Sequence, residues 1–238
     1  MSSLTVDAVT RTHVGLVRRR NEDAAYAGRY LFAVADGLGG HTAGDIASNT
    51  VIDVLSAYDR LADSADLTDA LGQAIHHANQ TLRARVEREP ELAGMGTTLV
   101  AMLWSGATVV VANMGDSRAY LLREGELTQL TEDHTYGNLV AGAADVPNLS
   151  EKIARFLDGR TDGRSPDLTP RGLHPGDRFL LCSDGLSGVV PVGVLQDVLE
   201  SHQDPGDVAE RLVSLALEDG GPDNITVIVV DVRERCSA

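Results

Sequence analysis

Cysteine is almost absent from this chain of 238 residues, which contains only Cys182 and Cys236. A secreted domain that depends on disulfides needs more cysteines, so we interpret both as unpaired thiols. No apolar stretch approaches the roughly 20 residues that cross a bilayer, and the first residues lack the apolar core of a signal peptide. These absences predict a cytoplasmic protein with no membrane segment in the sequence given.

Basic residues are also scarce, since 20 Lys and Arg stand against 35 Asp and Glu, for a net charge of −15. Nucleic acids and anionic membranes both attract positive surfaces, so neither is an expected partner. An acidic chain instead suits the binding of cations. Aromatic residues make up only 4%, but hydrophobic residues in total reach 43%, which can fill the core of one domain over residues 1–238.

Short apolar runs typical of β-strands alternate with segments of helical periodicity. We predict strands at residues 5–12, 31–35, 97–104, 108–112, 118–122, 178–182 and 225–232. Apolar residues recur at helical spacing over 47–61 and 67–86, and Asp204 followed by Pro205 is typical of a helix start. Two successive helices between groups of strands favour an α+β fold, in which helices cover antiparallel sheets.

Four aspartates stand at the ends of apolar runs, next to or near glycines. They are Asp36, Asp116, Asp184 and Asp223. A single Asp-Gly pair is ordinary turn chemistry. Four buried carboxylates together, however, would repel one another, and burying each as an unpaired ion costs several kcal/mol. Their recurrence therefore favours a site for divalent cations.

The donor atoms in this pattern are oxygens, which suit Mg²⁺ or Mn²⁺. Zinc is expected to recruit histidine or cysteine. None of the seven histidines has a recognisable ligand spacing, and His76 and His77 fall on a helical segment where a solvated surface position is typical. The sequence therefore predicts hard cations rather than zinc.

Three arginines and two acidic residues are crowded into residues 18–23, which read Arg-Arg-Arg-Asn-Glu-Asp. A solvated turn is the simpler interpretation. The alternative is that one arginine binds a phosphate group through two parallel hydrogen bonds. A local basic cluster would also offset the repulsion between an acidic protein and a phosphorylated substrate.

Six motifs resemble the bacterial branch of the protein phosphatase 2C family, and they follow the family's order across nearly the whole chain. They are Arg18-x-x-Asn21-Glu22-Asp23, Asp36-Gly37-Leu38-Gly39-Gly40-His41, Gly94-Met95-Gly96-Thr97-Thr98, Gly115-Asp116-Ser117-Arg118, Cys182-Ser183-Asp184-Gly185-Leu186 and Gly221-Pro222-Asp223-Asn224. The resemblance implies a four-layer α-β-β-α sandwich, with two antiparallel sheets flanked by helix pairs.

The resemblance also implies roles for the residues that match the family's metal ligands. Asp36 matches the aspartate that bridges two metals, and the carbonyl of Gly37 completes the shell of the second. Asp184 and Asp223 match the other carboxylates of the first metal. Asp116, together with Asp184, matches a third and weaker metal position.

Three further residues match positions around those ligands. Glu22 and Asp23 correspond to acidic residues that contact metal-bound waters, and Arg18 corresponds to the arginine that binds the substrate phosphate. The implied catalytic residues are then Arg18, Asp36, Asp184 and Asp223.

The function implied by the resemblance is hydrolysis of phosphoserine and phosphothreonine by a water that two Mn²⁺ or Mg²⁺ ions activate. Expected partners are phosphorylated Ser/Thr proteins, among them a cognate Ser/Thr kinase or a phosphorylated anti-sigma-factor antagonist. Two alternatives remain: a catalytically weak regulatory module with this fold, and a phosphatase of small phosphorylated metabolites. The presence of every metal carboxylate disfavours the regulatory module.

Two segments depart from the family pattern. Leu38 stands where the animal members have a histidine proposed as general acid, and His41 follows three residues later. We therefore predict that water protonates the leaving alkoxide. Residues 135–163 match the family's flap but are abbreviated, and their Gly and Ala content predicts a flexible cover near the site.

Overall fold

The computed structural model describes residues 4–39, 43–140, 149–161, 165–201 and 204–234. Its strands are β1 (Leu4–His13), β2 (Asp23–Ala27), β3 (Leu31–Leu38), β4 (Gly96–Thr97), β5 (Leu99–Ser105), β6 (Thr108–Met114), β7 (Arg118–Arg123), β8 (Glu126–Gln129), β9 (Asp167–Gly172), β10 (Arg178–Cys182) and β11 (Ile225–Glu234). Its helices are α1 (Ala43–Ser56), α2 (Leu67–Arg88), α3 (Tyr136–Leu139), α4 (Asp184–Ser187), α5 (Val192–Ser201) and α6 (Pro205–Glu218), with a 3₁₀ turn at Pro90–Leu92. Across these ranges, none of the helices has both the length and the apolar character needed to cross a bilayer.

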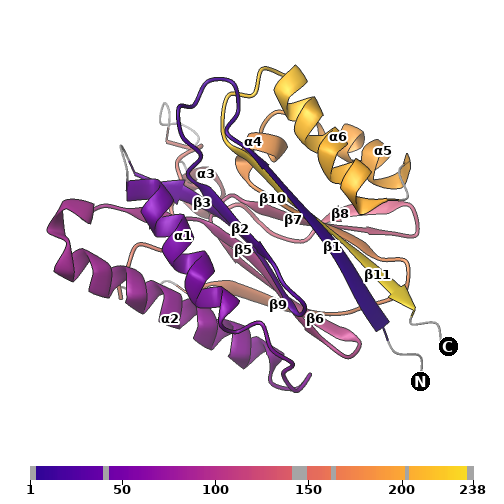
Figure 1. Cartoon of the computed structure of the whole chain (residues 1–238), viewed down its shortest axis with the longest axis horizontal. Coiled ribbons are helices and arrows are strands. Elements are labelled where there is room, and N and C mark those ends of the chain that lie inside the picture. The colour runs from indigo at the N-terminus through magenta and orange to yellow at the C-terminus, as the bar shows by residue number, and fades with distance from the viewer. Residues whose placement is uncertain (1–3, 40–42, 141–148, 162–164, 202–203, 235–238) are drawn as a thin grey trace.

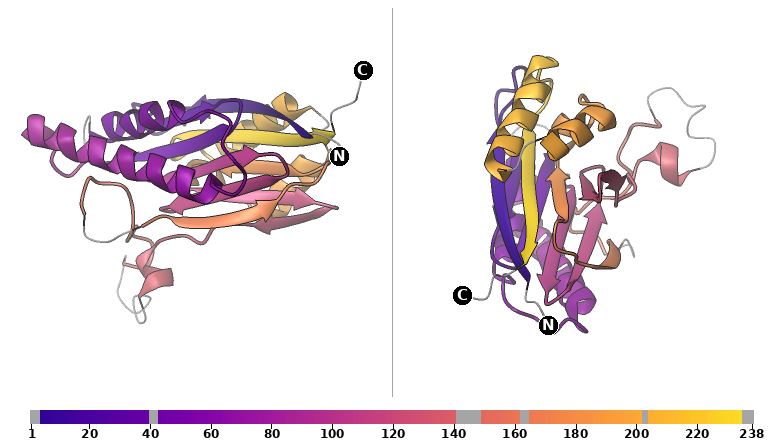
Figure 2. Two further views of the ribbon diagram at one scale, coloured as in Figure 1. Left: turned by 90° about the horizontal axis from the view of Figure 1, so that it is seen from below. Right: turned by 90° about the vertical axis from the view of Figure 1, so that its right-hand side faces the viewer.

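The strands form two antiparallel sheets that stack face to face (Figures 1 and 2). One sheet has the order β1-β11-β10-β7-β8, and the other has the order β2-β3-β5-β6-β9, with β4 added to β3. Helices α1 and α2 cover the outer face of the second sheet, while α5 and α6 cover the outer face of the first. The α+β prediction and the four-layer arrangement implied by the family resemblance are both confirmed.

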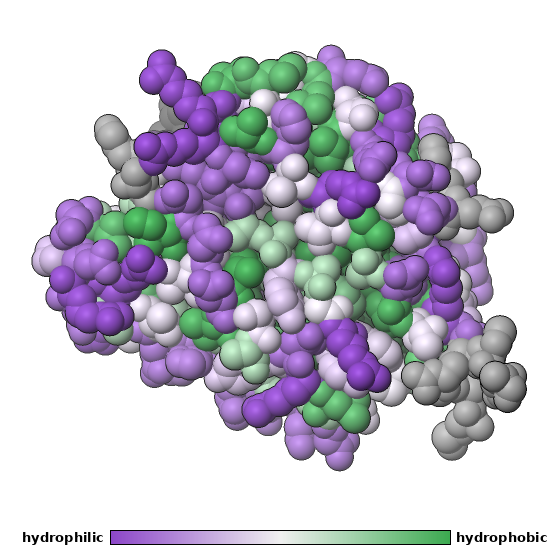
Figure 3. All heavy atoms as spheres, in the orientation of Figure 1, coloured by the Kyte–Doolittle hydropathy of each residue, from purple (hydrophilic) through white to green (hydrophobic). Residues whose placement is uncertain are grey.

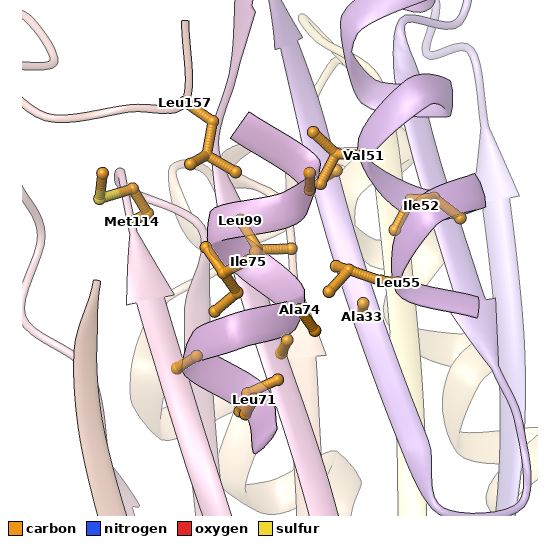
Figure 4. Close-up of a cluster of buried hydrophobic side chains, with 14 of the residues drawn as sticks. Ala33, Val51, Ile52, Leu55, Leu71, Ala74, Ile75, Leu99, Met114 and Leu157 are labelled. Atoms are coloured by element: carbon orange, nitrogen blue, oxygen red, sulfur yellow. The ribbon is translucent and has the colours of Figure 1, made fainter. Parts of the chain in front are cut away.

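Three hydrophobic clusters separate the four layers. In the cluster shown in Figure 4, Leu71 and Ile75 of α2 and Leu55 of α1 point toward the sheet that contains β3 and β5. Alternation along each strand supplies the other two clusters. Phe179 of β10 packs between the sheets, whereas its neighbour Leu180 packs beneath α5 and α6.

The surface outside these clusters is largely polar. On the face shown in Figure 3, hydrophilic side chains predominate and hydrophobic ones are scattered between them. Scattered apolar side chains are normal for a soluble fold.

Every predicted strand is present, although the one predicted at 97–104 is divided at Thr98 into β4 and β5, and β2, β8 and β9 were not predicted. Strand β9 contains a proline and ends in glycine, which is tolerated because β9 lies at the edge of its sheet. The start of α6 is confirmed, because the Asp204 carboxylate accepts hydrogen bonds from the N–H groups of Gly206 and Asp207. Helix α5 was not predicted, and α1 ends at Ser56, earlier than the periodicity indicated.

Asp59, just beyond α1, supports the turn between β2 and β3. Its Oδ1 accepts hydrogen bonds from the N–H groups of Tyr30 (2.6 Å) and Leu31 (3.0 Å). Its Oδ2 accepts from Arg29 N–H (2.9 Å) and from the Tyr26 hydroxyl (3.1 Å). Partial burial by itself raises the pKa of Asp59, but the backbone donors outweigh it and lower the pKa overall.

Asp59→Asn is therefore expected to destabilise the fold by about 1–2 kcal/mol at pH 7, because the amide NH₂ replaces one acceptor oxygen. Since folding lowers the carboxyl pKa, its stabilisation is complete above the unfolded value of about 3.9 and is lost as the pH falls through the folded value. Urea unfolding at pH 7 and pH 3.5 should show the difference from wild type shrinking in acid. Asp53→Asn, an exposed position on α1, is the matched control, and an equal loss in both variants would contradict the expectation.

Candidate metal centre

A cavity of about 720 Å³ is lined by residues at the end of β3 and just after β10. Its walls come from the β1–β2 loop, the end of β3, the start of α4 and the loop before β11. Of the residues predicted as site residues, the cavity is lined by Arg18, Glu22, Asp36, Gly37, Asp184 and Asp223. The four segments that carry these residues therefore meet at one cavity, which Ile153 also lines.

The backbone on both sides of Asp36 is held by two threonines. The Asp36 N–H donates to Thr98 Oγ1 (3.0 Å), while the Asp36 carbonyl accepts from the Thr97 hydroxyl and from Thr98 N–H (2.8 Å each). The Thr98 hydroxyl also contacts the buried Ser117 hydroxyl at 2.7 Å. These bonds fix the position of Asp36 within β3 and leave its carboxylate free to face the cavity.

Asp184 and Asp223 enter the cavity from the opposite sheet. Asp184 begins the short helix α4, with only Ser183 between it and the end of β10, and its charge acts on the buried carboxyl of Asp36. Asp223 lies in the loop before β11, where its Oδ2 accepts a hydrogen bond from Arg18 Nη2 at 2.5 Å. The Arg18 side chain is about half exposed, at 54%, against 30% for Asp223, so this ion pair lies at the rim.

Asp23 and Asp116 lie behind the cavity wall. Asp23 pairs with Asp36 across β2 and β3, and its Oδ2 accepts a hydrogen bond from the buried Ser183 hydroxyl at 2.8 Å. Asp116 follows β6 and Gly115. Within the described residues, one buried oxygen of each of Asp23, Asp116 and Asp184 has no hydrogen-bond partner. Three anionic oxygens are thus aimed into this region without a donor.

Burial and mutual repulsion raise the pKa of several of these carboxyls. The pKa of Asp36 lies well above its usual value, mainly because the carboxyl is buried and then because the charges of Asp23 and Asp184 repel it. Burial, with the charge of Asp184, raises the pKa of Asp116 to about 7, and burial raises that of Asp23 to about 6. Burial and then the charge of Asp223 raise the pKa of Asp184. Such a cluster gains stability when positive charge is added.

The cluster is not a closed metal cage. In the part of the chain that the structure describes, no three or more His, Cys, Asp or Glu side chains are already placed to hold a metal ion. The contacts show that Asp223 is already engaged, because its Oδ2 accepts from Arg18 and its Oδ1 accepts from Asn224 N–H at 2.8 Å.

Comparison with known proteins assigns this arrangement to a family. The family model for protein phosphatase 2C matches residues 9–139. The chain belongs to the protein phosphatase 2C family. The resemblance inferred from the six motifs is thereby confirmed.

Its relatives include bacterial phosphatases of about its own length and others about twice as long. The chain is 44% identical to the serine/threonine protein phosphatase PstP of Mycobacterium tuberculosis over 97% of its own residues, but it spans only 46% of that protein. It is 34% identical to the serine/threonine phosphatase stp of Listeria welshimeri and covers 94% of it. The crystal structure of the PstP catalytic domain, in complex with two manganese ions, superposes with a TM-score of 0.89 at 44% identity, over 97% of this chain and all of that one.

Gly37, the glycine of the family's Asp-Gly motif, stands where no side chain would fit. A Cβ added to Gly37 would overlap the carbonyl group of Gly44 at the start of α1 and would lie 2.7 Å from the carbonyl oxygen of Glu22. The Glu22 carbonyl also accepts hydrogen bonds from Gly37 N–H (3.2 Å) and the Ser48 hydroxyl (2.6 Å). Close packing of three backbone segments therefore accounts for this glycine, whether or not its carbonyl binds a metal.

Several supporting residues of this phosphatase-family site were missed from the sequence. The buried Ser183 bonds Asp23 and accepts from Thr226 N–H at 3.0 Å. His134, which is 1% exposed, accepts a hydrogen bond from Gly115 N–H at Nδ1 (3.1 Å), and its Nε2 contacts Asp167 Oδ2 at 3.0 Å. Ser183 belongs to one of the six motifs, but neither residue was assigned a role from the sequence, because their partners lie in other parts of the chain.

The two departures from the phosphatase 2C pattern are only partly visible. His41 and residues 141–148 and 162–163 lie outside the described residues. The rest of the flap is anchored near the site, since Tyr136 N–H bonds the Lys152 carbonyl and Ala154 N–H bonds the His134 carbonyl. Ile153 of this segment lines the cavity. The flexible cover stays a prediction.

Proposed function

We propose that this chain is a metal-dependent phosphoprotein phosphatase that hydrolyses phosphoserine and phosphothreonine. The observation that carries the proposal is the meeting of Arg18, Asp36, Asp184 and Asp223, from four separate segments, in one open cavity. Membership of a family whose relatives are named serine/threonine phosphatases supports it. Residues 1–238 act in this proposal as one catalytic domain.

The residues present fit two hard divalent cations. Asp36, Asp184, Asp223 and the Gly37 carbonyl would hold them, with Glu22 and Asp23 contacting their waters. Asp116 with Asp184 would hold a third. All these donors are oxygens, which suits Mn²⁺ or Mg²⁺, and the unpartnered oxygens of Asp23, Asp116 and Asp184 indicate that positive charge is needed here. When bound, the cations lower the pKa of a water so that it can attack phosphorus at neutral pH.

Arg18 has two possible partners in this scheme. In the structure it donates to Asp223. With substrate present, its guanidinium turns to the phosphate oxygens, where it orients the group and stabilises the charge that develops during attack. The ester P–O bond then breaks, releasing inorganic phosphate. The described residues lining the cavity include no histidine, so a water protonates the serine or threonine alkoxide.

The cellular role follows from the substrate class. A cytoplasmic phosphatase of this kind would reverse signalling by Ser/Thr kinases. Its partners would be phosphorylated proteins, including a cognate kinase or a phosphorylated anti-sigma-factor antagonist. Relatives named PstP, stp and PhpP support the phosphoprotein class.

Removal of metal tests the proposal. Hydrolysis of a phosphothreonine peptide should fall to about one per cent or less in excess EDTA and should return when Mn²⁺ is added in excess, because the attacking water depends on the cations. Sugar phosphates at the same concentration serve as the comparison. Faster hydrolysis of the sugar phosphates would favour the metabolite phosphatase, and full activity in EDTA would refute the metal-dependent mechanism.

A further inference from the structure

We infer that Arg19 and Arg20 form a second anion-binding subsite, which receives a carboxylate or phosphate of the substrate close in sequence to the phosphorylated residue bound by Arg18. This inference rests on the proposed function and specifies it further. The preferred substrates would be phosphoproteins with a second negative charge beside the hydrolysed residue.

Arg19 and Arg20 lie next to the arginine proposed to bind phosphate. Arg18, Arg19 and Arg20 all line the cavity, on the β1–β2 loop. Arg18 is engaged by Asp223, whereas Arg19 and Arg20 are exposed and form no side-chain hydrogen bond or ion pair with the described part of the chain. The charge of Arg20 acts on the nearby Glu22 carboxylate without forming an ion pair with it. A guanidinium keeps its charge at every physiological pH and offers a planar fork that matches two anionic oxygens.

Hydrogen bonds hold the backbone of the β1–β2 loop in place. Asn224 donates its side-chain N–H groups to the carbonyls of Val14 and Arg20 (2.9 Å each), and Glu22 N–H donates to Asn224 Oδ1 (2.8 Å). Leu16 N–H bonds the Gly221 carbonyl at 2.8 Å. The arginines therefore project from an ordered loop, so less entropy is lost when they bind a ligand.

Negative and positive side chains occupy different parts of the cavity. The carboxylates of Asp36, Asp184 and Asp223 are half-buried, whereas all three arginines are exposed along one rim. A phosphate bound by the cations and Arg18 would leave the neighbouring part of the substrate beside Arg19 and Arg20. In a chain of net charge −15, two unpaired cations at this rim attract an anion that most of the surface repels.

Exposed apolar side chains precede the arginines on the same loop. Leu16 and Val17, directly before the arginines, are 65% and 69% exposed. Together with the arginines they give one loop both apolar and cationic contacts, which suits an extended peptide better than a free small anion. The occupant is therefore assigned as part of the substrate chain.

The test uses three phosphothreonine peptides that differ at one position beside the phosphothreonine, which carries Gln, Glu or phosphoserine. The probe reaction is threonine-site hydrolysis with Mn²⁺ at low salt, followed by mass spectrometry. We expect kcat/KM for wild type to be about fivefold higher with Glu and about tenfold higher with phosphoserine than with Gln, as for exposed charge-assisted contacts. Moving the acidic residue along the peptide locates the subsite.

In the double variant Arg19→Gln/Arg20→Gln, both preferences should fall to about twofold or less. The control for a single lost charge is Arg171→Gln, which removes one arginine from an exposed position paired with Val109, at the end of β6 farther from Asp116. Its preferences should equal those of wild type. Arg19→Lys/Arg20→Lys should retain part of each preference, because charge is kept and the fork is lost.

The outcomes separate the two proposals. Hydrolysis of all three peptides at equal rates by wild type would leave the phosphatase proposal standing and overturn the subsite. Preferences that persist in the double variant would overturn it as well. A preference for phosphoserine alone assigns the subsite to a second phosphate, and similar preferences for both assign it to any anion. Failure of wild type to hydrolyse any of the peptides with Mn²⁺ would refute both proposals.

Discussion

Replacing Asp36 with asparagine is expected to lower turnover of a phosphothreonine peptide by about a thousandfold or more. Asp36 pairs with Asp23 across β2 and β3, and the charge of Asp184 also acts on its carboxyl. In our proposal Asp36 would help to hold both cations. Asparagine keeps the shape of the side chain but removes the charge and one anionic oxygen, so both cations should be weakened together.

Metal binding and stability give readouts that do not depend on turnover. Calorimetric titration should show that Asp36→Asn loses most of its affinity for Mn²⁺. The metal-free variant should unfold at an equal or higher urea concentration than metal-free wild type, because one member of a mutually repelling cluster has been neutralised. Wild-type Mn²⁺ affinity together with near-wild-type turnover would defeat the assignment.

Arg18→Gln distinguishes phosphate binding from metal binding. Its guanidinium contacts Asp223 in the structure and competes with cations for that carboxylate. The variant should therefore retain or gain Mn²⁺ affinity while KM for the peptide rises. A loss of metal affinity equal to that of Asp36→Asn would instead indicate that Arg18 holds the carboxylates in place.

The second large effect is expected at the opposite end of β10, where Arg178 pairs with Asp231 of β11. Arg178 Nε and Nη2 donate to the two Asp231 oxygens at 2.6 and 2.8 Å, and Nη1 donates to the Leu199 carbonyl at the end of α5 (2.8 Å). Both residues are under 10% exposed. Arg178→Met should lower the free energy of unfolding by about 3–5 kcal/mol, because Asp231 is left as a buried charge without this partner.

A double variant separates the charge effect from the packing effect. Arg178→Met/Asp231→Leu removes both charges and should recover most of the stability, as buried ion pairs replaced by apolar residues often do. Urea unfolding of wild type, the single variant and the double variant gives the comparison. A double variant no more stable than the single one would show that lost packing and the lost Leu199 contact, rather than the buried carboxylate, cause the defect.

The site was partly predictable because its carboxylates carry a local signature. Asp36 and Asp184 each precede a glycine and lie at the end of a buried apolar run, and Asp223 lies two residues before one. Such positions can be recognised from neighbouring residues alone. The Arg18–Asp223 ion pair could not be predicted, since the two residues are 205 positions apart. The same is true of Ser183 and His134, which were passed over because each acts through a partner on another strand.

The pattern of strands, helices and Asp-Gly positions was determined by the sequence itself, because periodicity and turn chemistry depend on residues within a few positions of one another. The order of strands in the two sheets and the meeting of four segments at one cavity were decided only by tertiary packing. So was the state of the carboxylates, since Asp223 accepts from Arg18 and the described residues enclose no ready-made metal cage. The physical reason is that pairing, burial and charge repulsion act between residues that the chain brings together only when it folds.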